Sequence, residues 1–364
     1  MVMRTILILV FFSICLSLFG CADYQEINDT ALVSGIAVDL GEKCGSYALS
    51  VEIVKPSASE GESPKAKVLT QEGRTAEACL NRLVNAATKE LLFSHCKLIL
   101  FSEEVAKEGI SEFVDYFLRS PEYRADLFLA IVAGNSAKDM LSVGEKESRV
   151  CSFDFAAVIR NSYTETGSVP PTRLYQYPAD EPFCMLPMFC RSDDLYEIEG
   201  TSCLRDGVQY ASLDLQKTKS VLLVSGECRS GEISLISATG DVISCRISDV
   251  KVKKSISDDL EISLDLSCNL ILTSLPDQFD LSTEAGVRRC GKDLSQMLSQ
   301  RIYGDWTALR REGLSDVFGF SVYVARYAPR LYRNGKYGKE ILLQPPRCTV
   351  SIVNLGYSDG GLAK

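Results

Sequence analysis

The feature that most restricts what this chain can form is an apolar segment close to its start. After Arg4, the segment Ile6–Phe19 is apolar apart from Ser13 and Ser17. A helix of this length spans roughly 21 Å at about 1.5 Å per residue, whereas the hydrocarbon core of a bilayer is roughly 30 Å thick. A basic start followed by a short apolar segment is typical of a secretory signal. No later segment approaches about eighteen apolar residues, so the signal is the only candidate for membrane insertion.

The apolar segment ends in Leu18-Phe19-Gly20-Cys21, which resembles a lipobox. In a lipobox the cysteine is lipidated and becomes the mature N-terminus, although Phe19 is bulkier than the residue usual at its place. The alternatives are a plain signal peptide that happens to end beside a cysteine, and a signal anchor that is never cleaved. We expect a signal peptide over residues 1–20 and an exported chain held to a membrane by acyl chains on Cys21.

The charge of the chain agrees with attachment through lipid. The formal net charge is −9, and removal of the first twenty residues takes away only Arg4 and leaves −10. A chain this acidic is repelled by nucleic acid and by anionic headgroups. We therefore expect no nucleic-acid partner, and we expect the covalent lipid, not the protein's charge, to hold the chain at the membrane.

Apolar periodicity predicts strands and helices in alternation. Strands are expected at Ala31–Asp39, Tyr47–Val54, Lys67–Gln71, Lys97–Phe101, Leu127–Ala133, Tyr196–Leu204, Gln209–Leu213, Leu260–Cys268 and Thr349–Asn354. Helices are expected after Thr75, after Ser102 as far as Gly109, at Ser111–Arg119, after Ser136, at Asp214–Val224 and at Val287–Ile302. In Ser111–Arg119, the spacing of Phe113, Val114, Phe117 and Leu118 predicts one core-facing stripe.

These patterns predict an α+β, multi-domain chain with mixed sheets flanked by helices. The segment Thr164–Pro187 holds five of the twelve prolines and is expected to be a connector. We place an N-terminal α/β region, with part of a middle lobe, at residues 21–190 and a C-terminal α/β domain at residues 191–364.

Signals of catalysis are absent from the sequence. His95 is the only histidine, which removes Ser-His-Asp and Cys-His systems that do not use it, and it precedes a buried-looking strand. We interpret it as a structural histidine. The chain has no GxSxG, P-loop or strand-linked GxGxxG motif. We expect no enzyme, no metal site and no cofactor beyond the lipid on Cys21.

Twelve cysteines remain beside Cys15 and Cys21, at irregular spacing and without CxxC. That spacing supports neither a zinc ribbon nor a thioredoxin-like motif. We interpret most of them as reduced, buried core residues, with a few disulfides as the alternative.

Several of these segments resemble the Ger(x)C family of spore germination lipoproteins, the C subunits of germinant receptors. The matching motifs are Glu26-Ile27-Asn28-Asp29, Gly35-Ile36-Ala37-Val38-Asp39, the stretch Phe93–Leu141 that includes His95, Gly200–Gly207 and Asp316-Val317-Phe318-Gly319-Phe320. Asp23-Tyr24 stands where the family has a pair led by Trp. The resemblance runs nearly from end to end, and the order of elements agrees.

The resemblance implies three packed α/β lobes and a non-catalytic receptor subunit on the outer face of the inner spore membrane. It implies integral membrane partners of A and B type. Arg119 and Arg124 match basic positions of a family element and are candidate interface residues, with local salt bridges as the alternative. A solute-binding lipoprotein of a transporter is the second hypothesis, and an exported hydrolase is the third.

Overall fold

The computed structural model describes residues 3–4, 29–55, 64–147, 149–177, 183–192, 195–237, 239–257, 261–274, 279, 281–329 and 345–357. The predicted signal segment Ile6–Phe19 and its cysteine, Cys21, therefore lie outside the described residues. Among the helices within these ranges, none has both the length and the apolar character that crossing a bilayer requires.

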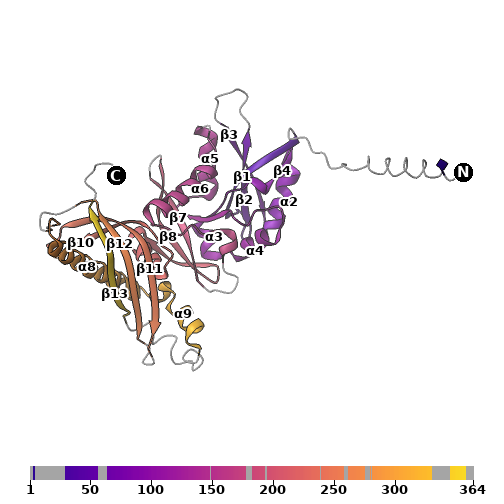
Figure 1. Cartoon of the computed structure of the whole chain (residues 1–364). Helices are drawn as coiled ribbons and strands as arrows, with labels where there is room; N and C mark the ends of the chain where they lie inside the picture. The colour runs from indigo at the N-terminus through magenta and orange to yellow at the C-terminus, as the bar shows by residue number, and fades with distance from the viewer. Residues whose placement is uncertain are drawn as a thin grey trace.

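A large mixed sheet forms the N-terminal half of the structure (Figure 1). Its strands are β1 (Thr30–Leu40), β2 (Tyr47–Lys55), β3 (Lys65–Gly73), β4 (Glu90–Leu92), β5 (Leu98–Ser102), β6 (Phe128–Val132), β7 (Phe183–Ser192), β8 (Leu195–Arg205) and β9 (Val208–Asp214). The order is β3-β2-β1-β5-β6-β7-β8-β9, and β4 also pairs with β1. The pairs β1–β5, β5–β6 and β6–β7 are parallel, whereas β1–β2–β3 and β7–β8–β9 are antiparallel.

Helices cover both faces of this sheet, which explains why its central strands are apolar without alternation. One face packs against α2 (Ala76–Ala86), α3 (Glu103–Glu108) and α4 (Ser111–Arg119). The other face packs against α5 (Ala137–Glu147) and α6 (Cys151–Asn161). In β5, Ile99 and Phe101 enter the first core, and Leu98 and Leu100 enter the second.

The predicted helix ends are confirmed by their caps. The Thr75 hydroxyl accepts a hydrogen bond from the Ala78 amide at 3.2 Å, and the Ser102 hydroxyl accepts one from Val105 at 3.4 Å. Both arrangements satisfy first-turn amides that have no partner within the helix. Gly109 ends α3 with a φ of 129°. The expectation for Leu118 was wrong: its side chain is 41% exposed, because the buried stripe of α4 is only as wide as Phe113, Val114 and Phe117.

A second, four-stranded sheet forms the C-terminal half. It has the order β10 (Gly231–Ile236), β11 (Val242–Ile256), β12 (Ile262–Leu272) and β13 (Arg347–Tyr357), with β12 and β13 parallel. Figure 1 shows the long helix α8 (Glu284–Arg311) against this sheet. The predicted alternation is confirmed from Ile262 onward, because Ile262, Leu264, Leu266 and Cys268 are buried against α8 residues of the same core. Leu260 lies outside the described residues.

The two sheets share one hydrophobic core through α7 (Leu215–Ser225), which starts after its cap, Asp214, where the helix Asp214–Val224 was expected. Met185, Cys203 and Leu213 of the first sheet belong to the same buried cluster as the second sheet. Beyond α8, the chain forms the short turn η5 (Ser315–Phe318) and α9 (Phe320–Tyr327). The expected α+β class with mixed sheets flanked by helices is confirmed.

The prediction that Thr164–Pro187 is a connector was wrong for the last residues of this segment. It contains the 3₁₀ turn η4 (Leu174–Gln176), and the π turn η3 (Ser162–Thr166) enters it, but Phe183–Pro187 already belongs to β7. Pro187 is tolerated because β7 pairs with β6 only at Met188 and Phe189. The division between residues 190 and 191 falls inside β7, and it stays a prediction about folding units.

Candidate functional site

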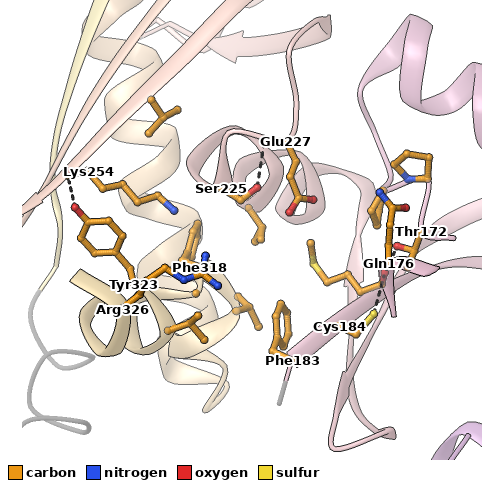
Figure 2. A pocket seen from close by; sticks show the side chains of 18 of the residues that line it. Thr172, Gln176, Phe183, Cys184, Ser225, Glu227, Lys254, Phe318, Tyr323 and Arg326 are labelled. Carbon is orange, nitrogen blue, oxygen red and sulfur yellow. Dashed lines mark hydrogen bonds between the residues drawn. The ribbon is translucent and has the colours of Figure 1, made fainter. Parts of the chain in front are cut away.

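A cleft of about 540 Å³ lies between the two halves of the molecule (Figure 2). Five parts of the chain line it: the η4 segment, the start of β7, the end of α7, β11, and the turn from η5 into α9. A volume of this size is typical of sites for small molecules, and such sites favour junctions between lobes. We therefore take this cleft as the candidate functional site.

The apolar wall of the cleft comes from both halves. Val221, Met185 and Phe318 line it and are buried, and Phe183 at the start of β7 is half-buried. In Figure 2, Phe183 and Cys184 lie across the cleft from Phe318 and Tyr323. Of these side chains, the half-buried Phe183 presents apolar surface to the cleft, and the buried ones support it from behind.

The motif Asp316-Val317-Phe318-Gly319-Phe320 builds one end of this wall. Gly319 has a φ of 67°, a conformation that favours glycine, and it turns the chain from η5 into α9. Asp316 accepts hydrogen bonds from the Ser321 amide at 3.1 Å and from the Ser321 hydroxyl at 2.5 Å. The motif thus fixes the start of α9 and places Val317 and Phe318 at the cleft.

Three charged side chains line the cleft beside this apolar wall: Glu227, Lys254 and Arg326. Figure 2 shows Lys254 and Arg326 entering from the side of β11 and α9, and Glu227 from the end of α7. The Tyr323 hydroxyl donates a 2.7 Å hydrogen bond to the Lys254 carbonyl and ties α9 to β11. Burial lowers the pKa of Lys254, and the negative charge of Glu227 acts in the opposite direction.

A second polar group, centred on Glu52, lies within the first half and is structural. The Glu52 carboxylate accepts hydrogen bonds from the Ser34 hydroxyl at 2.7 Å, from the Cys151 amide at 2.7 Å, and from both the amide and the hydroxyl of Ser152. Burial raises the pKa of Glu52, and the Ser152, Ser34 and Cys151 hydrogen bonds act in the opposite direction. A carboxylate surrounded by donors and closed from solvent holds a helix end and has no room for a substrate.

Asp39 plays the same part for the neighbouring helix. It accepts hydrogen bonds from the Ala137 amide at 2.7 Å and from the Lys138 amide at 2.9 Å, at the start of α5. Gly35 lies against α6, where a Cβ would stand 2.5 Å from Ser152 Cβ. The motif Gly35–Asp39 therefore docks both helices on the sheet, which is an architectural role.

The sequence-predicted site residues lie apart from the cleft. Arg119 pairs with Asp115 at 2.9 Å, and Arg124 pairs with Asp126 at 2.9 Å. All four side chains are about half exposed or more. His95 is exposed at the end of a 3₁₀ turn, shortly before the strand β5, which is buried as expected. Sequence reasoning missed Lys254 and Arg326, because a lysine in a strand and an arginine in a short helix carry no motif.

Eight of the twelve cysteines are buried, as expected for small core residues. They are Cys79, Cys96, Cys151, Cys203, Cys228, Cys245, Cys268 and Cys290. Burial raises the pKa of Cys96, Cys203 and Cys245 to about 12. In the part of the chain that the structure describes, no three His, Cys, Asp or Glu side chains gather as a metal site would require.

Comparisons with known proteins follow the two halves of the chain. Residues 23–179 match the family model described as "Spore germination protein N-terminal domain". Residues 199–342 match the model described as "Spore germination B3/ GerAC like, C-terminal". The interval between the two matches contains the expected division at residues 190 and 191.

Curated relatives come from Bacillus subtilis (strain 168). Spore germination protein A3 is 24% identical over 236 residues, which cover 63% of this chain and 62% of that protein. Spore germination protein KC is 25% identical over 133 residues, which cover 34% of this chain and 32% of that protein. The putative spore germination protein YfkR is matched over 35% of its length. The chain thus spans about a third of the length of KC and YfkR in these matches.

The fold is also found in a solved structure. The crystal structure of the GerBC protein superposes with a TM-score of 0.56 over 89% of this chain and 97% of that one. Its sequence is 16% identical, so this likeness concerns the fold alone.

Proposed function

Because this chain belongs to the GerAC-like family of spore germination proteins, we propose that it is a lipid-anchored, non-catalytic C subunit of a nutrient germinant receptor. In this role it acts with integral membrane subunits of A and B type to trigger germination. The observation that carries the proposal is the pair of family matches, which together account for residues 23–179 and 199–342 in family order.

The anchor in this proposal is the lipid on Cys21. The acidic net charge of −9 opposes adsorption to anionic lipid. Two or more acyl chains give stable membrane attachment without a spanning helix. We propose that they hold the chain on the outer face of the inner spore membrane, beside its A and B partners.

The non-catalytic part of the proposal is supported by the polar groups of the fold. Glu52 and Asp39 are each occupied by the amides of a helix end. The single histidine, His95, lies on the surface, in the first half, and is not among the residues that line the cleft. These groups serve packing, and the family itself is not known for catalysis.

A second candidate is a solute-binding lipoprotein of a transporter, and the cleft between the two halves favours it. The two candidates differ in what is lost when the chain is removed. A receptor subunit is required for the spore's response to a nutrient, whereas a solute-binding lipoprotein is required for uptake by growing cells.

The proposal is tested with spores whose only copy of the chain is Cys21→Ala, beside a deletion strain and a wild-type complement. We expect the variant to leave the spore membrane fraction and nutrient-triggered germination to fall to the deletion level. Normal germination in the deletion strain, with solute uptake lost in growing cells, would support the transporter role instead. A Cys21→Ala chain that stays in the membrane fraction after its partners are removed contradicts the anchor.

A further inference from the structure

Lys254 is placed in the cleft by the alternation of β11. Successive side chains of a strand point to opposite faces. Val252 and Lys254 therefore share one face and both line the cleft, whereas Lys253 is exposed on the other face. Lys253 lies opposite Asp265 on β12, and Lys254 lies opposite Leu264. Two adjacent lysines thus occupy different environments.

The Lys254 side chain is half-buried, and the charge of Glu227, which lines the same cleft, acts on it from beyond ion-pair distance within the described residues. In the described ranges, no carboxylate oxygen lies within the 4.0 Å of an ion pair from its Nζ. The nearest aromatic face is that of Tyr323, whose centroid is 6.0 Å away. Burial lowers the pKa of this lysine, which means that the surroundings disfavour its charge. An anion in the cleft would offset that cost.

A second cation, Arg326, lines the same cleft from α9, one turn of helix beyond Tyr323. Figure 2 shows the Lys254 and Arg326 side chains on the same side of the cleft, with Phe183 across from them. An anion beside Lys254 shares the cleft with the half-buried side chain of Phe183, whereas Val221 and Phe318 line the cleft but are almost fully buried. A hydrated inorganic anion would leave the accessible part of Phe183 uncovered, whereas an organic anion would cover it.

We propose that this cleft binds a small organic carboxylate, with its carboxylate paired to Lys254 and its apolar body against Phe183. The volume of about 540 Å³ accommodates a molecule of this class. This inference goes beyond the receptor role and does not depend on it, because binding to the cleft can be measured with the isolated full chain.

The test uses the full chain in detergent and a matched pair of probes, 3-phenylpropionate and 3-phenylpropanamide. The two share an aromatic body and differ in charge at one end. Titration calorimetry is expected to show binding of the carboxylate and at least ten-fold weaker binding of the amide. Equal binding of both probes, or no binding of the carboxylate at millimolar concentration, would overturn the proposal.

Two lysine variants locate the site. Lys254→Met keeps the aliphatic stem and removes the ammonium, and it should weaken 3-phenylpropionate binding at least ten-fold. Lys253→Met makes the same change one residue earlier, on the other face of β11, and should bind as the wild type does. Melting curves of both variants confirm that each is folded. If folded Lys254→Met binds 3-phenylpropionate as tightly as Lys253→Met does, the carboxylate does not pair with Lys254 and the proposal is wrong.

Discussion

The carboxylate of Glu52 on β2 accepts a 2.7 Å hydrogen bond from the backbone amide of Cys151, the first residue of α6 and 99 residues further along the chain. A helix start carries amides without intrahelical partners and a partial positive charge, and a buried carboxylate satisfies both. Asp39 on β1 does the same for α5. Two acidic side chains from neighbouring strands thus hold both helices on one face of the first sheet.

Removal of the Glu52 carboxylate should cost more than removal of any one of its partners. Glu52→Ala leaves the Cys151 and Ser152 amides buried and unpaired, and we expect a loss of about 2–4 kcal/mol in the free energy of unfolding. Ser34→Ala leaves both amides paired and should cost about 1 kcal/mol. Denaturant unfolding measures both variants. Equal losses would contradict the docking role of Glu52.

The pH dependence of stability should reflect the same group. Burial raises the pKa of Glu52 in the folded state above its ordinary value of 4.5. The folded chain therefore holds this proton to higher pH than the unfolded chain. The stability it contributes is complete below pH 4.5 and is lost as the pH rises through the folded pKa. The free energy of unfolding of the wild type should therefore exceed that of Glu52→Gln by more at pH 4 than at pH 8. A difference between the two chains that grows with pH would contradict a raised pKa of Glu52.

The cysteines should behave as reduced core residues. Burial raises the pKa of Cys151 and Cys203 to about 12, so these thiols carry no thiolate at neutral pH and react slowly while the chain is folded. In denaturant without reductant, we expect all twelve cysteines after Cys21 to be alkylated. In the native chain the exposed Cys44 should react first. Mass spectrometry counts the adducts, and six disulfides would leave none.

Arg119 and Arg124 can be tested together by the double change to Gln. Each arginine pairs with a carboxylate from its own short segment, Asp115 or Asp126, and exposed pairs of this kind contribute little to stability. We expect an unchanged melting temperature. If these residues meet a membrane partner, spores with the folded double variant should lose the nutrient response. Normal germination of these spores would contradict an interface role and would show that the two arginines only form local salt bridges.

Local sequence patterns were sufficient to predict most of the secondary structure. Thr75 and Ser102 were identified as helix starts because capping depends on a side chain and the amides three residues later. The alternation from Ile262 to Cys268 identified β12 because one face of that strand is packed and the other is not.

Features that depend on distant partners were not predictable in this way. The strand at Phe183–Pro187 was missed because a proline indicates a break unless its partner is known, which for Pro187 is Thr201 on β8. Glu52 reads as a polar residue in a strand until α6 is placed above it. Lys254 could not be predicted as a cleft residue, because the cleft forms only where the fold brings α9 and β7 next to β11.

The receptor role is tested most directly by what remains bound to this chain in spore membranes. An affinity-tagged chain, solubilised from those membranes in mild detergent, is purified and its partners are identified by mass spectrometry, with an untagged strain as control. The account predicts that one A-type and one B-type integral membrane subunit co-purify with it in comparable amounts. Recovery of the chain without either subunit, while both remain in the same solubilised extract, would contradict it.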